Sequence, residues 1–296
     1  MTGRSLPLDW VDAFTDRPFG GNGCAVVHDG GALPPETCMA VVRETSLVEC
    51  TFVGPSDVAD VRVRYFLAGQ EIPFAGHPTI ATVASLVHRG LVSGDRITLE
   101  TGAGLVPCTL GEGWITMTQA APGFGPEVDP ALVAAVVGLE ASDIIEPPQV
   151  VSTGLPFCVA VVRDRATIRR ARMNPEALAT FRAALAEAVP GALNSAMEPY
   201  LVTLEGASAA GSTFARLILA PPNPPEDPFT GSATGAAAAY LWSRGLLADP
   251  VYLAEQGHDM GRPGQARVEV LGPPDAITGV RVGGQAHVLM SGVLRL

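Results

Sequence analysis

With 296 residues, a formal net charge of −11, 47% hydrophobic residues and only 17% charged ones, the chain has ample material for buried cores. This composition excludes a disordered protein. The acidic charge disfavours nucleic acid or an anionic membrane as a partner, because both attract clustered Lys and Arg. The length suits two domains of about 150 residues or one large domain.

The cysteines are odd in number, lie far apart and show no metal-ligand spacing, so they indicate neither a disulfide framework nor a zinc site. They are Cys24, Cys38, Cys50, Cys108 and Cys158. The first ten residues have no apolar core of signal-peptide length, and no apolar run reaches the roughly 18 residues of a membrane span. We therefore expect a cytoplasmic protein that binds no membrane and no nucleic acid.

The first part of the chain predicts strands around two helices. Alternating or extended apolar segments predict strands at 6–14, 24–28, 46–53, 61–66 and 96–101. The stretch from Pro34 to Thr45 predicts a helix with proline in its first turn. Residues 78–89 predict a second helix that is apolar on nearly all sides, and such a helix belongs inside a core.

A segment rich in proline and glycine, 119–130, breaks both periodicities and is expected to link two domains. Beyond it, helices are predicted at 130–138 and 175–189, and an almost wholly apolar helix includes 235–242. Strands are predicted within 150–162, where 153–156 breaks the strand pattern, and at 200–204, 212–219, 251–255, 267–270, 280–282 and 287–289.

Two stretches match each other without a gap at a constant offset of 155 residues. They are Glu71-Ile-Pro-Phe-Ala-Gly-His-Pro-Thr and Glu226-Asp-Pro-Phe-Thr-Gly-Ser-Ala-Thr, and the match continues to Arg89-Gly90-Leu91 and Arg244-Gly245-Leu246. A spaced coincidence of this kind indicates an internally duplicated fold. Because strands flank both copies, we expect two strand-rich layers, each curled around one buried helix.

Each copy ends at the start of its helix. Pro78 suits a first helical position with His77 at or beside the cap, and Ser232 is a favoured cap residue after Gly231. Helix N-termini offer free N–H groups and a positive dipole end, which together suit a carboxylate or a phosphate. A purely structural cap and turn would explain one such helix equally well. The duplication favours two helix starts that face a shared cleft.

Three titratable side chains are candidates for chemistry. Asp227 and His77 both stand beside Pro-Phe-Xaa-Gly turns, where their pKa values can shift. Glu49 interrupts the apolar run 47–53, where a carboxylate is costly unless it is paired or protonated. A carboxyl group with a raised pKa can carry a proton to and from a substrate at neutral pH. A structural histidine and an outward-facing glutamate remain the alternatives.

Six segments, in order along nearly the whole chain, resemble the PhzF-like isomerases. They are Asp12-Ala-Phe-Thr-Asp-Arg-Pro-Phe-Gly-Gly-Asn-Gly, Glu44-Thr-Ser-Leu-Val-Glu-Cys-Thr-Phe-Val, Pro73-Phe-Ala-Gly-His-Pro-Thr, Glu100-Thr-Gly-Ala-Gly-Leu-Val-Pro, Asp227-Pro-Phe-Thr-Gly-Ser-Ala-Thr-Gly and Gln256-Gly-His-Asp-Met-Gly-Arg-Pro.

The resemblance implies a mixed α/β (α+β) fold of the diaminopimelate-epimerase type. Such a fold has two pseudo-symmetric domains, each a curled, mostly antiparallel sheet around a central buried helix. We expect the domains at 1–118 and 119–282, with the tail from about 283 to 296 returning to the first domain. The resemblance also implies a homodimer and catalysis without a cofactor or a metal.

Carried over by motif, Glu49 is implied to be the general acid/base that shuttles a proton, with His77 and Asp227 as further catalytic residues. Substrate-binding roles are implied for Gly76, Gly231 and Ser232. The implied reaction is the isomerisation of a small unsaturated cyclic or diene carboxylic acid in natural-product biosynthesis, such as that of phenazines or other antibiotics. Its substrate would resemble trans-2,3-dihydro-3-hydroxyanthranilate.

Other functions stay open. One is an isomerase for a modified amino acid of the alkylproline type, and another is a non-catalytic binding protein. A two-thiol racemase or epimerase is disfavoured, because Ala75 and Thr230 stand where those enzymes place thiols. The chain departs from the family pattern near the expected pocket, at Cys24, Ser46, Val48 and 67–70. These departures leave the substrate open.

Overall fold

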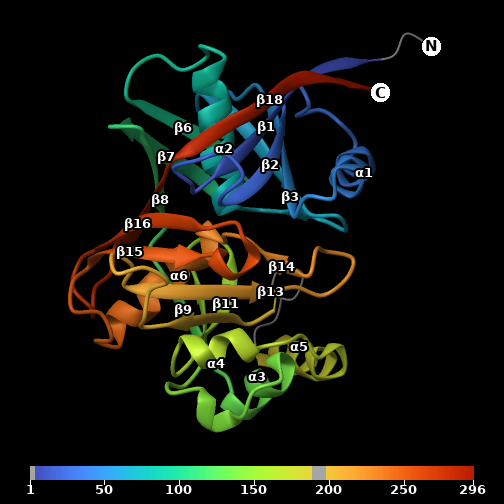
Figure 1. Cartoon of the computed structure of the whole chain (residues 1–296). Helices are drawn as coiled ribbons and strands as arrows, with labels where there is room; N and C mark the ends of the chain where they lie inside the picture. The colour runs from blue at the N-terminus through green and yellow to red at the C-terminus, as the bar shows by residue number, and fades with distance from the viewer. Residues whose placement is uncertain (1–3, 189–197) are drawn as a thin grey trace.

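The computed structural model describes residues 4–188 and 198–296, and Figure 1 shows two parts that lie one above the other. The helices are α1 Pro35–Thr45, α2 Gly76–His88, α3 Pro130–Val137, α4 Arg165–Arg170, α5 Pro175–Ala188 and α6 Gly231–Ser243. The last residue of the helix predicted at 175–189 lies outside the described residues. In Figure 1, α1 and α2 belong to one part and α3 to α6 to the other.

Eighteen strands among the described residues are hydrogen-bonded into one continuous network. Those around α2 are β1 Ser5–Ala13, β2 Asn22–Val27, β3 Glu49–Gly54, β4 Val61–Phe66, β5 Glu71–Ile72, β6 Arg96–Thr101, β7 Gly104–Gly111, β8 Trp114–Gln119 and β18 Ala286–Arg295. Those around α6 are β9 Gly123–Glu127, β10 Gln149–Ser152, β11 Pro156–Val161, β12 Tyr200–Thr203, β13 Thr213–Ile218, β14 Glu226–Asp227, β15 Val251–Gln256, β16 Gly264–Leu271 and β17 Gly279–Gly284.

The two parts repeat one topology. In each, two parallel strands (β2 and β3, or β11 and β12) are joined through surface helices. A short antiparallel hairpin (β4–β5, or β13–β14) then leads into the buried helix, and a further strand runs parallel to the first strand of the hairpin. The helices α2 and α6 have the same length and are separated by the offset of 155 residues. The predicted duplication is therefore confirmed.

Both central helices are buried because their residues are apolar or small all round. Helix α2 packs against β1, β2, β3, β8 and β18, and α6 packs against β10, β11, β12, β16 and β17. Most strand pairs are antiparallel, so the curled sheets around buried helices agree with the predicted mixed α/β class. Strand β18 pairs with β1 along almost its whole length. Strand β8 pairs with β17 and so joins the strands around α2 to those around α6.

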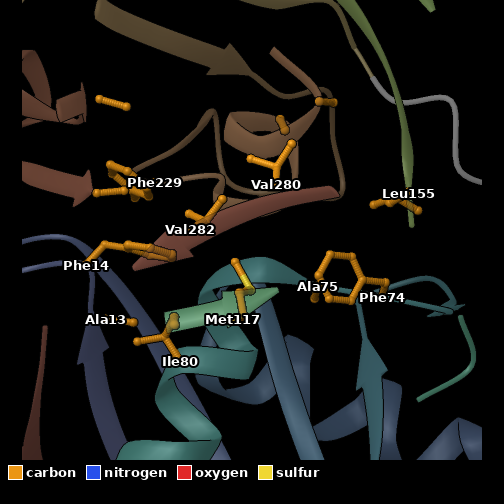
Figure 2. Packing of buried hydrophobic residues seen from close by; sticks show 14 of the residues in the cluster. Ala13, Phe14, Phe74, Ala75, Ile80, Met117, Leu155, Phe229, Val280 and Val282 are labelled. Carbon is orange, nitrogen blue, oxygen red and sulfur yellow. The ribbon is translucent and has the colours of Figure 1, made fainter. Parts of the chain in front are cut away.

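Aromatic side chains fill the seam between the two parts. Phe14 stacks on Phe229 with ring centroids 4.4 Å apart, and Figure 2 shows Val282 beside this pair. Phe74 and Ala75, which lead into α2, lie at the same seam, as does Leu155 (Figure 2). These side chains belong to one hydrophobic core that spans both parts of the molecule.

Three expectations about local structure are wrong. The segment 119–130 is not free of regular structure, because β9 forms within it and pairs with β10. Helix α2 begins at Gly76, two residues before the predicted position. The final strand is ten residues long, because pairing with β1 stabilises residues whose own pattern is not strand-like. In all three cases, long-range pairing or burial outweighs local preference.

Candidate active site

The N-termini of α2 and α6 meet in the middle of the molecule. A Cβ atom added to Gly76 would lie 2.2 Å from the backbone nitrogen of Ser232 and 2.6 Å from the Cα of Gly231. A Cβ at Gly231 would lie 2.6 Å from Cζ of Phe14. Side chains do not fit at such distances, so glycine is required for the two helix starts to touch. The structure thus brings together the two repeated turns, as the sequence predicts.

The caps differ from those predicted. Helix α2 has Ala75 at its N-cap and Pro78 in its first turn, and α6 has Thr230 at its N-cap. Ser232 is therefore the second helical residue and not the cap. Neither N-cap side chain bonds to the helix. Because first-turn amides have no intrahelical acceptor, both helix starts keep N–H groups for other partners.

Glu49 is the first residue of β3 and lies at the edge of this meeting point. Its side chain is 13% exposed, and Oε2 stands 3.5 Å from Nδ1 of His77. Burial, and secondarily the negative charge of Asp227, raise the pKa of Glu49 well above its ordinary value. A carboxyl group in such a place exchanges protons at a higher pH than a solvent-exposed glutamate does.

His77 is a neutral group in this arrangement. It is 2% exposed, and burial lowers its pKa to about 3, with the charge of Arg262 acting in the same direction. Its Nδ1 lies 2.9 Å from Nδ2 of Asn22, and among the described residues Nε2 has no hydrogen-bond partner. An uncharged imidazole beside Glu49 can exchange a hydrogen bond with the carboxyl group without fixing it in the ionised form.

Asp227 is the second carboxyl group of the site. It ends β14 and is 3% exposed, and burial raises its pKa to about 7. Hydrogen bonds from Thr230 (2.6 Å to Oδ2) and Asn22 (2.5 Å to Oδ1) oppose this shift because they favour the ionised form. Asp227 therefore titrates close to neutral pH, within the same pocket as Glu49.

A narrow pocket connects these groups. Its wall contains three of the predicted residues, Glu49, Asp227 and Ser232, and the rest of the lining is mostly apolar: Val48, Leu67, Leu155, Phe157, Leu217, Leu219, Asn223 and Thr230. The other predicted residues, His77, Gly76 and Gly231, do not line the pocket but contact residues that do: His77 lies beside Glu49, and the two glycines lie beside Ser232. The volume open to a water-sized sphere is about 20 Å³, comparable to one water molecule. A molecule larger than water therefore needs the lining residues to move before it can enter.

Sequence reasoning missed the residues that hold Asp227 in place. Asn22 donates to Asp227 and to the carbonyl oxygen of Phe229, and so joins β2 of one part to the α6 start of the other. Gln256 donates to the backbone oxygen of Asp227 (2.7 Å) and accepts from the amide of Thr230 (3.0 Å). Asn22 and Gln256 stand in motif segments quoted above, which was the available signal.

The loop that leads into Asn22 is held by hydrogen bonds from the other part of the molecule. Arg262 donates to Oδ1 of Asp12 (2.7 Å) and to the carbonyl oxygens of Gly20 and Gly21 (2.9 Å each). Asp12 is 1% exposed, and its Oδ2 accepts from the amide of Phe19. One arginine from the second part therefore fixes the turn that places Asn22 between His77 and Asp227.

The two positions at which two-thiol racemases have cysteines are occupied by other residues in this chain. Ala75 and Thr230 are the N-cap residues of α2 and α6, and all five cysteines are buried and unpaired. Burial raises the pKa of Cys24 and Cys50, the two cysteines near Glu49. Thiolates, which the two-thiol mechanism requires, are disfavoured in such surroundings.

Within residues 4–188 and 198–296, no three or more His, Cys, Asp and Glu side chains gather as a metal ion would require. No helix there has both the length and the hydropathy needed to cross a bilayer.

Comparison with known proteins agrees with this architecture. Residues 11–292 match the family model described as phenazine biosynthesis-like protein. An uncharacterized isomerase of Deinococcus radiodurans is 33% identical over 96% of this chain and 92% of its own length. The trans-2,3-dihydro-3-hydroxyanthranilate isomerase of Pseudomonas aeruginosa is 29% identical over 95% of this chain and 96% of its own length.

Solved structures lead to the same fold. A PhzF-family phenazine biosynthesis protein of Bacillus anthracis superposes with a TM-score of 0.82 at 27% identity, covering 98% of this chain and 99% of that one. A hydroxyproline epimerase of Agrobacterium vitis shares the fold with a TM-score of 0.67 at 14% identity, covering 100% of this chain and 93% of that one. The predicted fold class is confirmed, and the chain belongs to the phenazine biosynthesis-like family, a family of isomerases.

Proposed function

We propose that this isomerase moves a proton between two carbons of a small unsaturated carboxylic acid, with Glu49 as the general acid/base. The observation that carries the proposal is the place of Glu49. It is a buried carboxyl group with a raised pKa, in an apolar pocket beside two converging helix N-termini. Helix starts attract the carboxylate of a substrate, and the carboxyl side chain exchanges the proton.

The proposed reaction needs no external reagent. Ionised Glu49 takes a proton from a carbon next to the unsaturated system, and the electron pair of the broken C–H bond moves into that system. The carboxylic acid of Glu49 then returns the proton to a second carbon, so that a double bond has shifted and the enzyme is unchanged. His77 stays neutral and holds the Glu49 side chain. Asp227 in its protonated form offers a hydrogen bond to a polar group of the substrate.

The lining favours a substrate with one carboxylate and an apolar body. The chain contains no lysine, and none of its arginines lines the pocket. Backbone amides at the α2 and α6 starts are thus the positive ends available to an anion there. A second carboxylate would face both Glu49 and Asp227 without a countercharge. A dihydro-hydroxyanthranilate-like ring or an alkylproline-type precursor from antibiotic biosynthesis satisfies these conditions.

The test is proton exchange in heavy water. With trans-2,3-dihydro-3-hydroxyanthranilate and a panel of cyclic and diene monocarboxylates, the wild type should place one deuteron on a single carbon of the product. Glu49→Gln should abolish this exchange. Glu198→Gln is the matched control, because Glu198 is also a buried carboxylate but does not line the pocket. Unaltered turnover in Glu49→Gln would disprove the proposed role.

We also propose that the protein acts in the cytoplasm as a homodimer. What supports a dimer is the free edge of β18, since among the described strands β18 pairs only with β1. Met290 and Val293 on this strand are 57% and 52% exposed, and exposed apolar residues at a sheet edge favour association. Light scattering on the purified protein should give twice the mass of the chain, and Met290→Lys should reduce that mass.

A further inference from the structure

An arginine and a glutamate hold the hairpin that carries Asp227. Arg216 on β13 donates through Nε and Nη2 to the two carboxylate oxygens of Glu226 on β14, over 2.9 and 2.6 Å. Both side chains are largely buried, with exposures of 10% and 13%. A two-point contact between a planar guanidinium and a carboxylate fixes their relative orientation as well as their distance.

The remaining guanidinium nitrogen anchors this pair to a third element. Nη1 of Arg216 donates to the carbonyl oxygens of Ile168 and Ala171, over 2.8 and 3.3 Å, at the C-terminal end of α4. One side chain therefore connects β13, β14 and the segment after α4. Strand β14 is only two residues long, so its own ladder holds it weakly. Its orientation then depends on contacts beyond its own ladder, and the Arg216–Glu226 pair supplies these from the side of Glu226.

Because side chains alternate along a strand, holding Glu226 on one side of β14 also fixes the side to which Asp227 points. Glu226 pairs with Ile218, and Asp227 pairs with Leu217. Successive residues of a strand face opposite sides, so Asp227 and Leu217 face the pocket while Glu226 and Arg216 lie behind it. The linings of two separate cavities agree, because Asp227 and Leu217 line the small pocket and the arginine pair lines another.

We propose that Arg216 and Glu226 are positioning residues that hold the Asp227 carboxyl group in the pocket from behind. This inference rests on the proposed function, in which that pocket is the catalytic site. Neither residue touches the pocket, and both act through the two-residue strand β14. Loss of the two-point contact lets the hairpin move and admits water to Asp227.

The half around α2 contains an equivalent arginine–glutamate pair, but no carboxyl group follows that glutamate. Arg64 on β4 donates to Glu71 on β5 over 2.8 and 2.7 Å. Its Nη1 reaches the carbonyl oxygens of Leu33 and Gly31. The residue after Glu71 is Ile72, which packs in the core. Arg64 is therefore an internal control for the general structural value of such a pair.

Charged and titratable groups surround Asp227 on several sides. Glu49 approaches from β3, neutral His77 from α2, and Glu226 precedes Asp227 on β14, where its negative charge favours the protonated form. The cation of Arg216 offsets the charge of Glu226. Removing that cation without any movement would therefore raise the pKa of Asp227. Removing the anchor with movement would lower this pKa, because water would reach the carboxyl group.

Because the two effects shift the pKa of Asp227 in opposite directions, a titration of Asp227 distinguishes them. The probe is the side-chain carbonyl ¹³C signal of Asp227, assigned with Asp227→Asn and titrated in the intact protein without any ligand. For Arg216→Gln and Arg216→Lys, the pKa of Asp227 should fall from about 7 towards its ordinary value of 3.8. Lysine keeps the charge but cannot make the two-point contact. Arg64→Gln and Arg64→Lys should leave this titration unchanged.

A kinetic readout accompanies the titration. With trans-2,3-dihydro-3-hydroxyanthranilate as the probe, both Arg216 variants should lose about 10- to 100-fold in kcat, as expected when a group that contacts the substrate is misplaced by an ångström. The Arg64 variants should retain the kcat of the wild type per folded molecule. Should Arg216→Gln fail to fold, Arg216→Lys carries the same test.

The outcomes separate this inference from the proposed function. A higher Asp227 pKa in Arg216→Gln, or an unchanged one in Arg216→Lys, would show that the arginine acts only by its charge and would overturn the inference. Equal effects of the Arg64 and Arg216 variants would overturn it as well. Failure of the proposed function would appear elsewhere, as deuterium exchange that survives Glu49→Gln, and would leave the ¹³C result intact.

Discussion

Substitution of Gly76 by alanine tests whether contact between the two helix starts builds the site. The added Cβ would lie 2.2 Å from the backbone nitrogen of Ser232, whereas ordinary contacts begin at about 3.4 Å. The obstructing atoms are backbone, so no side chain can rotate away. The helix starts must separate by more than about 1 Å, and a displacement of that size at a catalytic site costs about 100-fold in rate.

The same clash lowers stability. Overpacking a filled interior costs about 1–3 kcal/mol, and the rigid neighbours place Gly76→Ala at the upper end of that range. Thermal unfolding should show a Tm several degrees lower, and kcat/KM should fall by about two orders of magnitude. Gly69→Ala is the control, because nothing lies within 4 Å of its added Cβ. A Gly76→Ala enzyme with the Tm and the activity of the wild type would refute the close approach.

Three further predictions concern the titrating groups and the thiols. Because burial raises the pKa of Asp227 from 3.8 to about 7, the folded state binds its proton more tightly than the unfolded state does. The free energy of unfolding of the wild type should therefore fall between these pH values as pH rises, relative to Asp227→Asn, in urea titrations across that range. Asn22→Leu removes a hydrogen bond that favours ionised Asp227, so ¹³C titration should show a still higher pKa. Iodoacetamide at neutral pH should label no cysteine of the folded enzyme and leave activity intact, since all five thiols are buried, whereas protectable inactivation would favour a thiol mechanism.

The repeated turns could be predicted because their information is local. Glycine, proline and the small residues of 71–79 and 226–234 repeat at one offset, and the structure places both copies at equivalent helix starts. This comparison did not match the arginines of the two hairpins. The loop of the second hairpin is three residues longer, so Arg64 and Arg216 stand 152 residues apart and not 155. A gap-free comparison therefore ends at Glu71 and Glu226.

The contacts across the seam could not be predicted from local pattern. Asn22 and Asp227 are separated by 205 residues, and Asp12 and Arg262 by 250 residues. Neither pair has a spacing that marks it in the sequence, because folding alone brings these residues together. Glu49 was identifiable because a carboxylate inside an apolar strand is costly unless the fold has a use for it. His77 was identifiable too, but nothing in the local pattern of either residue indicates that the two side chains lie 3.5 Å apart.

The two halves are alike in fold, yet each gives the pocket a carboxyl group from a different position. Thr51 pairs with Tyr65 in the first half, and Tyr200 pairs with Leu217, the residue after Arg216, in the second. Glu198 is therefore equivalent to Glu49, since Glu49 stands two residues before Thr51 and Glu198 two residues before Tyr200, just ahead of β12.

Glu198 does not line the pocket, because its side chain bonds to groups elsewhere. Its Oε1 accepts from the amide of Ala220 (2.9 Å) and from Arg182 (3.1 Å). Conversely, Asp227 is equivalent to Ile72, which is buried in the core. Each half thus gives the pocket an acid from a position that the other half does not use for the pocket. Two equivalent carboxylates on a pseudo-twofold axis would share one environment and titrate as a coupled pair. Non-equivalent positions instead let Glu49 and Asp227 take different protonation states, which is what a single proton shuttle beside a hydrogen-bond donor requires.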